Sequence, residues 1–435
     1  MTQSLTLSRL FHSRGYEFLM FSICVLYALT ALPRLEMSEL FKNLIIVGSL
    51  PALFTKVGRK EGNNTIFWVF LLSFVVQIVS WLNSLMVIPE WATASPQIKT
   101  LSALFLFVFI AFWMNGNKNR TLVLYGALIL SFIATACYHN YLHHSFAAGW
   151  AGKRVSFGMH NAQYTSMLSV VVAGLAIYIA AEIPKSRWRP LAYLITAAIV
   201  LFSLFTLGIS QSRQVWLAVV VTALLAPLIC YRSINYRHAL VIYLLLGAVG
   251  TALYQVNFVK QRIFKESSVI EKVVTGDWDH IPMTSVGIRV NSWIEASHWI
   301  ARSPILGSDR PSVKLVLHTA EKFQTRRLKG FGHLHNYYIE TLVAYGVVGI
   351  LFLVIFYRTV IRNVMQNQAY SQHIFLLLFL IYWAVINCFE SYNTKDLGLY
   401  AHNIVLAGLF VYLLPKRLAP LATERSAKTK EHSSE

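Results

Sequence analysis

Long apolar runs recur along most of the chain, and short polar stretches separate them. A helix that crosses a membrane needs about 20 mostly apolar residues. We expect twelve such helices, at residues 16–32, 39–55, 65–86, 98–114, 121–138, 161–183, 190–209, 215–231, 238–256, 337–357, 372–390 and 398–414. The second run is the weakest, because Lys42 and Pro51 lie in it. The pattern predicts an all-α polytopic membrane protein with about 12 transmembrane helices.

Composition agrees with a membrane protein and excludes several other classes. Of the 435 residues, 56% are hydrophobic and 13% are charged, whereas soluble domains are about 25% charged. A soluble, disordered or fibrous protein is therefore excluded. The net charge of +19 would suggest nucleic acid in a soluble protein, but here the basic residues lie mainly between apolar runs. The four cysteines form no C-x-x-C pair, so we expect neither a disulfide framework nor a zinc site.

The basic residues of the short loops predict the orientation. With a cytoplasmic N-terminus, the cytoplasmic segments carry nineteen Lys and Arg residues and the short loops on the other side carry five. Cytoplasmic loops are the basic ones, so both ends are predicted inside. No small-residue cleavage site follows the first run, which we therefore expect to be retained. The expected division is helices 1–9 in residues 1–256, a large outer loop in 257–336, helices 10–12 in 337–414 and a polar cytoplasmic tail in 415–435.

The outer loop, residues 257–336, is too rich in aromatic and aliphatic residues for disorder. It carries twelve basic and seven acidic residues, an excess that suggests an anionic ligand. Apolar residues fall at helical spacing at Val290, Trp293, Ile294, Ile300 and Ala301, and polar ones fall opposite at Asn291, Ser292, Glu295, His298 and Arg302. This predicts an amphipathic helix that ends at Pro304. It either lies along the membrane interface or packs on the bundle.

Three short motifs carry candidate chemistry. The first is S-x-S-R-x-x-W-L at residues 210–217, with Arg213 between two spans. Arg213 is either an interface anchor or part of a functional pocket. The second is R-x-x-x-W, in which Arg289 opens the loop helix and could also be an ordinary solvated charge. The third is H-x-H-N-x-x-I-E at residues 333–340, where His335 is a packing residue, an interface residue or an acid/base group.

The order of these motifs is more specific than each alone. A later S-P-I-L-G follows the second motif at residues 303–307, and a G-x-x-G follows the third at residues 346–349. This arrangement resembles the O-antigen ligase (WaaL-type) family, within the ligase/polymerase superfamily of bacterial surface polysaccharides. The likeness covers the whole topology, although its motifs occupy only about residues 190–360. It implies a GT-C-like glycosyltransferase of the bacterial inner membrane with its active site facing the periplasm.

The resemblance also implies a reaction in lipopolysaccharide biosynthesis. A glycan linked to undecaprenyl pyrophosphate would be transferred to lipid A-core oligosaccharide, with inversion and without metal, nucleotide or other cofactor. Arginine forks suit phosphate oxygens, so Arg213 and Arg289 are expected to hold the diphosphate. His335 is expected to act as the base, since an imidazole with a pKa of about 6.5 can accept the acceptor's proton.

Further substrate contacts are expected from a wider set of polar residues: Gln211, Asn336, Tyr337, Lys153 and Arg154. We expect no metal. Asp277 and Asp279 form a D-x-D pattern, which is a common accidental match. The histidines His139, His143 and His144 are better interpreted as solvated groups or headgroup contacts.

Three alternatives stay open at this point. Within the same superfamily the chain could be an O-antigen polymerase or a protein O-oligosaccharyltransferase, which act on other acceptors. From another class it could be a twelve-span lipid or solute transporter. Transport sites usually lie on charges near the membrane midplane, whereas the unusual charges here lie at span ends and in the outer loop. No motif for a nucleotide or nucleic acid is present.

Overall fold

The computed structural model describes residues 11, 13–33, 36–55, 62–232, 235–255, 264, 266–325 and 332–413. A helix occupies each of the twelve predicted runs: α2 Arg14–Thr30, α3 Met37–Phe54, α5 Asn64–Val87, α6 Lys99–Ser102 with η1 Ala103–Phe105 and α7 Leu106–Met114, α8 Lys118–His143, α10 Ala162–Glu182, α11 Arg189–Ser210, α12 Arg213–Ile229, α13 Tyr236–Gln255, α18 Tyr337–Asn367, α19 Tyr370–Asn387 and α20 Asp396–Leu409. The predicted tail, residues 415–435, lies outside the described residues.

Seven of these helices are long and apolar enough to cross a membrane: α3, α5, α8, α10, α11, α18 and α19. The helical stretch from Lys99 to Met114, α12, and Tyr236–Ala248 of α13 are shorter apolar helices. The prediction of an all-α polytopic membrane protein is therefore confirmed. The number of crossings and their orientation stay predictions.

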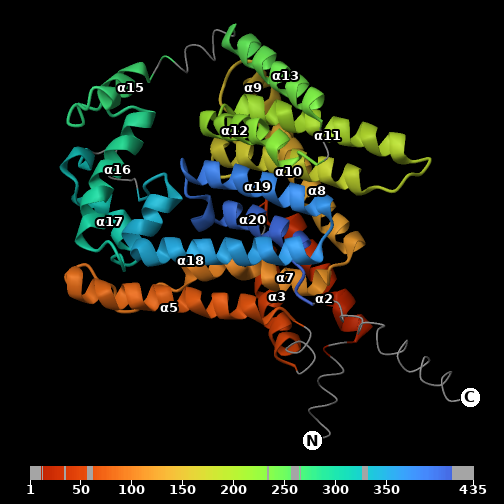
Figure 1. The fold of residues 1–435 in the computed structure, drawn as a ribbon, viewed down its shortest axis with the longest axis horizontal. Helices are drawn as coiled ribbons and strands as arrows, with labels where there is room; N and C mark the ends of the chain where they lie inside the picture. The colour runs from red at the N-terminus through yellow and green to blue at the C-terminus, as the bar shows by residue number, and fades with distance from the viewer. Residues whose placement is uncertain are drawn as a thin grey trace, which may run out of the picture.

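Two helices form the centre of the bundle. Every residue of α7 is buried, and so is every residue of α20 from Leu397 to Leu409 except Leu399. Helix α20 packs against α7 and α8, while α18 packs against α5 and α12 against α19. Figure 1 shows α20 enclosed by its neighbours. Apolar side chains on all faces, as in α7, are expected of a helix surrounded by protein or lipid.

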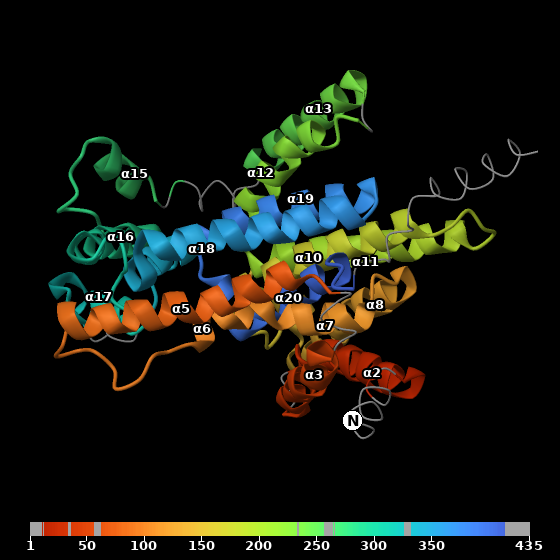
Figure 2. The same cartoon turned by 60° about the horizontal axis from the view of Figure 1, so that its bottom comes forward.

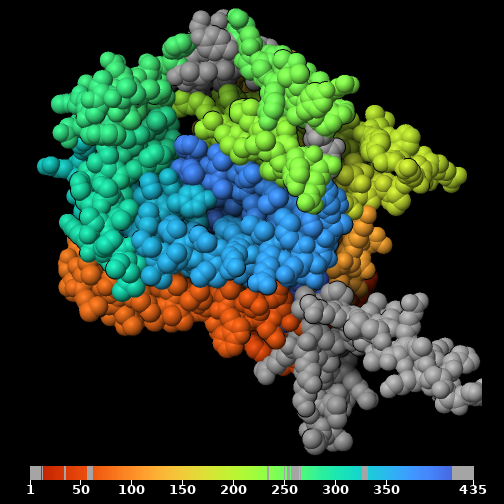
Figure 3. Space-filling view, in the orientation of Figure 1, coloured from red at the N-terminus to blue at the C-terminus, as the bar shows by residue number. Residues whose placement is uncertain are grey.

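Within its described residues, the outer loop forms three α-helices, α15 Ser267–Val274, α16 Ser285–Arg302 and α17 Ser312–Thr319. They gather at one end of the bundle, which we call the loop end (Figures 1 and 2). Figure 3 shows that they form one continuous surface with α5 on this side. Helix α16 packs against α17 and α18, so the loop helix covers the bundle.

The predicted amphipathic helix exists as α16, but it starts earlier than predicted and buries a different set of side chains. It begins at Ser285, four residues before Arg289, and the hydroxyl of its N-cap Thr284 accepts a hydrogen bond from the Gly287 N–H. Asn291 and Ser292, predicted on the polar face, are buried. This part of the prediction was wrong because hydrogen bonds satisfy both side chains: Asn291 donates to the carbonyls of Gly287 and Ile281, and Ser292 to the carbonyl of Arg289.

The S-P-I-L-G and G-x-x-G motifs meet in space. Helix α18 breaks at Gly346, where φ is 58° and ψ is −158°, a conformation essentially restricted to glycine. The break leaves backbone groups unpaired within the helix, and residues 304–309 bind them. Val347 N–H donates to Pro304 O at 2.9 Å, and Ser308 N–H donates to Val343 O at 2.9 Å. The joint fixes the loop helices to α18.

Replacing Gly346 by alanine is expected to destabilise the protein by about 3 kcal/mol or more. The backbone strain is one reason, and the other is that an added Cβ would lie 2.3 Å from the Ile305 carbonyl oxygen. Thermal unfolding of the purified protein measures the effect. Gly126→Ala is the matched control, because no atom of the described residues lies within 4 Å of a Cβ at this position in α8. Equal melting temperatures of the two variants would contradict the prediction.

Candidate functional site

A cavity of about 360 Å³ lies at the loop end, where four segments of the chain meet. Its lining includes both predicted arginines, Arg213 from α12 and Arg289 from α16. The other lining residues are Arg154, Gln163, Gln211, Ser212, Gln214, Leu217, Glu266, Ser285, Val286, Trp293 and Phe389. The cavity thus brings together guanidinium groups that are 76 positions apart in the sequence, as a site for a phosphate-bearing ligand requires.

A tight turn places Arg213. Helix α11 ends at Ser210, Gln211 adopts a left-handed conformation with φ of 54°, and α12 starts at Arg213. The guanidinium NH2 of Arg213 donates to Glu266 Oε1 at 3.1 Å. Glu266 is buried and also accepts from the Thr284 hydroxyl at the start of α16. Burial would raise the pKa of Glu266, but the hydrogen bonds from Thr284 and Arg213 outweigh burial and lower it. This carboxylate therefore joins α12 to α16.

Arg289 faces the cavity from α16. Its NH1 donates to the Ser285 carbonyl at 2.8 Å and its NH2 to Gln214 Oε1 at 3.3 Å. Its Nε is buried and has no hydrogen-bond partner among the described residues. Burial lowers the pKa of Arg289, although a guanidinium remains a cation at neutral pH. An unsatisfied buried donor on a cation is costly, so a bound anion would stabilise this side chain.

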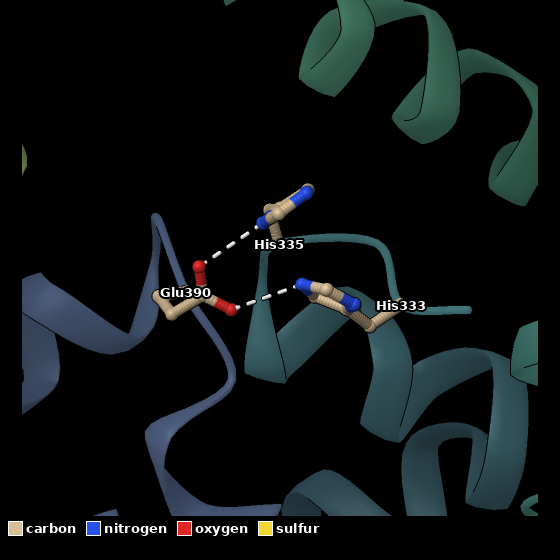
Figure 4. Close-up of side chains that lie close together, drawn as sticks. All are labelled: His333, His335 and Glu390. Carbon is tan, nitrogen blue, oxygen red and sulfur yellow. Dashed lines mark hydrogen bonds and ion pairs between the residues drawn. The ribbon is translucent and has the colours of Figure 1, made fainter. Parts of the chain in front are cut away.

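His335 pairs with a buried acid from a distant segment. Its Nδ1 lies 3.0 Å from Glu390 Oε2, and His333 Nε2 lies 3.3 Å from Glu390 Oε1 (Figure 4). Glu390 follows α19 and is 2% exposed. The Gln163 amide connects this pair to the arginine. In the orientation that satisfies both neighbours, its nitrogen donates to Glu390 Oε2 at 2.6 Å and its oxygen accepts from Arg289 NH2 at 3.3 Å.

The cluster sets the protonation of the imidazole. Burial lowers the pKa of His335, although the hydrogen bond to Glu390 acts in the opposite direction; the neighbouring His333 and Arg289 lower it further. Burial would raise the pKa of Glu390, but hydrogen bonds from His333 and His335 lower it. A neutral His335 beside an ionised Glu390 carries its proton on Nδ1, which leaves the lone pair on Nε2. The lowered pKa therefore favours the neutral form of His335.

Both backbone polar groups of Leu334, which lies between the two histidines, are hydrogen-bonded. Trp293, one helical turn after Arg289, donates from its indole to Leu334 O at 2.9 Å. The Leu334 N–H donates to Glu340 Oε1 at 2.9 Å, and the same oxygen accepts from the Ser391 hydroxyl at 2.6 Å. Glu340 is buried and paired with Arg310 at 2.7 Å. The second and third motifs therefore fix the position of His335 and of the segment that carries Glu390.

Residues 198–354 match the family model whose description is O-antigen ligase. This part of the chain, about a third of its length, is therefore similar to the O-antigen ligase family. This match supports a place in the O-antigen ligase/polymerase superfamily and confirms the predicted resemblance at that level. A search of curated proteins found no match.

The matched region, residues 198–354, contains both arginines and His335, while two of their partners lie outside it. Gln163 precedes this region and Glu390 follows it. Sequence reasoning missed both, and it counted Glu266 only as one acid of the loop. A signal existed for Glu390, an acid at the end of the predicted span 372–390. Nothing in the local spacing connects Gln163 to the site.

The other predicted contact residues occupy different places. Gln211 and Arg154 line the cavity, and each also bonds a backbone carbonyl: Gln211 that of Gly152 at 2.9 Å and Arg154 that of Ser210 at 3.1 Å. Lys153 is exposed and is not among the residues that line this cavity. The Asn336 side chain caps α18 by accepting from the N–H groups of Tyr338 and Ile339. Tyr337 is 2% exposed, so its ring packs in the interior. Their roles toward substrate stay predictions.

Among the described residues, one cluster has the donors for a metal ion. The ligand atoms of His333, His335 and Glu390 all lie within 4.8 Å of one another, and two imidazoles with a carboxylate are a common zinc set. The same atoms make the hydrogen bonds described above, which account for their positions without an ion. In the D-x-D pattern, Asp277 is engaged by Lys272 at 2.5 Å and by His280 at 2.6 Å.

Proposed function

We propose that the protein is an O-antigen ligase, which transfers a glycan from undecaprenyl pyrophosphate to lipid A-core oligosaccharide on the periplasmic side of the bacterial inner membrane. The observation that carries this proposal is the continuous chain from Arg289 through Gln163 and Glu390 to His335. It joins a cation suited to a diphosphate to a base suited to a hydroxyl. The match to the O-antigen ligase family model and the apolar helices support a lipid-linked glycan as the substrate class.

The reaction balances as a single displacement with inversion. The acceptor hydroxyl oxygen forms a bond to the anomeric carbon of the glycan, while the bond from that carbon to the diphosphate oxygen breaks. His335 Nε2 takes the hydroxyl proton as attack proceeds, and Glu390 stabilises the resulting imidazolium. Arg213 and Arg289 stabilise the charge that develops on the diphosphate. The lipid diphosphate supplies the energy of the bond, so no nucleotide is needed.

The acceptor decides between the members of the superfamily. Purified protein is incubated with a lipid-pyrophosphate glycan and, in separate reactions, rough lipopolysaccharide, a second lipid-linked repeat unit or a pilin, without nucleotide. Transfer to rough lipopolysaccharide is the expected result. Transfer only to the repeat unit would indicate a polymerase, and transfer only to the pilin a protein O-oligosaccharyltransferase. The absence of transfer to every acceptor would return the transporter to consideration.

Transfer is expected to continue at an unchanged rate after treatment with a chelator. The two arginines supply the positive charge that a divalent cation would otherwise provide to a diphosphate, and the His335–Glu390 pair needs no ion to accept a proton. The initial rate is measured before and after exhaustive dialysis against EDTA. A loss of activity that a divalent cation restores would contradict this prediction, and would assign His333, His335 and Glu390, or Asp277 and Asp279, as ligands.

A further inference from the structure

A second cavity lies at the loop end, beside the segment that carries His335. Its volume is about 340 Å³, and its lining consists of Trp91, Gln97, Arg310, Pro311, Val313, Lys314, Leu315 and Gly332. Trp91 and Gln97 belong to the connection between α5 and α6, which lies near α17 in Figure 2. Of these residues, the site described above involves Arg310 alone, through its ion pair with Glu340.

The lining has the chemistry of a carbohydrate subsite. Trp91 is 48% exposed, and an indole exposed in a cavity offers an apolar face on which the apolar face of a sugar ring can stack. The Gln97 amide can both donate hydrogen bonds to hydroxyl groups and accept hydrogen bonds from them. The exposed Lys314 ammonium adds three hydrogen-bond donors. Ligand sites usually combine aromatic walls with a few such polar groups.

Hydrogen bonds hold the Trp91 segment in place before any ligand binds. The N–H groups of Trp91 and Ala92 donate to the Ile88 carbonyl at 2.9 and 3.0 Å. The Trp81 indole, on α5, donates to the Thr93 carbonyl at 2.8 Å. A subsite on an ordered segment loses little conformational entropy on binding, so this loop is suited to hold a sugar.

The cavity lies close to the segment that carries His335. Gly332 in its wall precedes His335 by three residues, so their Cα atoms lie no more than about 11 Å apart. Arg310 in its wall is paired with Glu340, which also binds the N–H of Leu334. A glycan that reacts at His335 therefore has this cavity within reach of its neighbouring sugar rings.

We propose that the cavity around Trp91 is a glycan subsite, in which a sugar ring stacks on the Trp91 indole close to the glycosidic bond that the enzyme makes. This inference rests on the proposed function. The same chemistry fits a sugar of the acceptor oligosaccharide or a sugar of the donor glycan, and the kinetic test below separates these two sources.

The test compares Trp91→Ala with Trp91→Tyr and Trp278→Ala. Tyr keeps an aromatic face, and Trp278 is the matched control because it is also 48% exposed and lies outside this cavity. Binding of soluble core oligosaccharide and of the glycan released from its lipid is measured by saturation-transfer NMR and calorimetry. Loss of one stacking contact is expected to weaken the binding of one glycan about tenfold in Trp91→Ala, with partial recovery in Trp91→Tyr and no change in Trp278→Ala.

The kinetic arm identifies the source of the sugar. A raised KM for rough lipopolysaccharide alone assigns the subsite to the acceptor, and a raised KM for the lipid-pyrophosphate glycan alone assigns it to the donor. Unchanged binding of both glycans by Trp91→Ala would overturn the proposal. Because the binding arm needs no turnover, it still decides if the wild-type protein transfers nothing. If Trp91→Ala does not fold, Gln97→Ala is measured in its place by the same binding and kinetic experiments.

Discussion

Replacing His335 by alanine is expected to lower the rate of glycan transfer by about 10²–10⁴-fold, the usual contribution of a general base. The acceptor hydroxyl is a poor nucleophile unless its proton is removed during attack. The buried Glu390 carboxylate orients the imidazole through Nδ1 at 3.0 Å, so Nε2 is the atom that accepts the proton. The kcat of the purified variant with rough lipopolysaccharide measures the effect.

Two controls show that the effect is chemical. The amount of His335→Ala in the membrane should be close to that of the wild type, while its melting temperature should be lower because the buried Glu390 loses a hydrogen bond. His318→Ala is the matched substitution, because His318 is exposed in α17 of the same loop and should leave kcat unchanged. Full transfer by His335→Ala in cells and in vitro would remove this residue from the mechanism.

The same base predicts the pH dependence of the wild-type enzyme. His335 faces Glu390, His333 and Arg289, and burial leaves its pKa below the ordinary 6.5 of histidine. A base works in its deprotonated form, so kcat/KM is expected to be constant around pH 7. It should fall only when the pH drops through this lowered pKa. A rate that instead rises with acidity would identify His335 as an acid rather than a base.

The positions of the helices and the three central residues could be predicted from the sequence, because both depend on local patterns. Apolar runs locate the twelve helices of the bundle, although not α15 and α17 of the outer loop, and the motifs locate Arg213, Arg289 and His335. Contacts across the fold could not be predicted in this way. Glu390 meets His335 only because the end of α19 packs beside the start of α18, and no spacing along the chain encodes that contact.

The predicted polar face of α16 was wrong at two positions where backbone hydrogen bonds allow a polar side chain to be buried. Asn291 and Ser292 are buried in α16 because backbone carbonyls accept from both, so polarity alone placed them on the wrong face. Asn336 had a clear local signature, since an Asn just before an apolar helix is a favoured N-cap. The cap explains why this residue follows His335: it starts α18 directly after the histidine and thereby fixes the direction in which the chain leaves the site.

Arg289→Ala is expected to lower kcat by about 10²–10³-fold, as the loss of one donor to a developing negative charge does in other enzymes. Arg289→Lys should restore only part of this loss. The NH1 of Arg289 donates to the Ser285 carbonyl and its NH2 to Gln214, and its buried Nε has no partner within the part of the chain that the structure describes. Lysine places a single charged nitrogen and cannot make these contacts while also holding a diphosphate.

The control for Arg289 lies on the same helix. Arg302 stacks on the Trp299 ring at 5.3 Å and is exposed, so Arg302→Ala removes a guanidinium from α16 without changing the cavity and should leave kcat unchanged. Arg213→Ala should resemble Arg289→Ala in kcat, and it also leaves the buried Glu266 without its cation, so a lower melting temperature is expected as well. If Arg289→Lys were as active as the wild type, the guanidinium fork would have no role, and a simple positive charge would be enough to bind the leaving diphosphate.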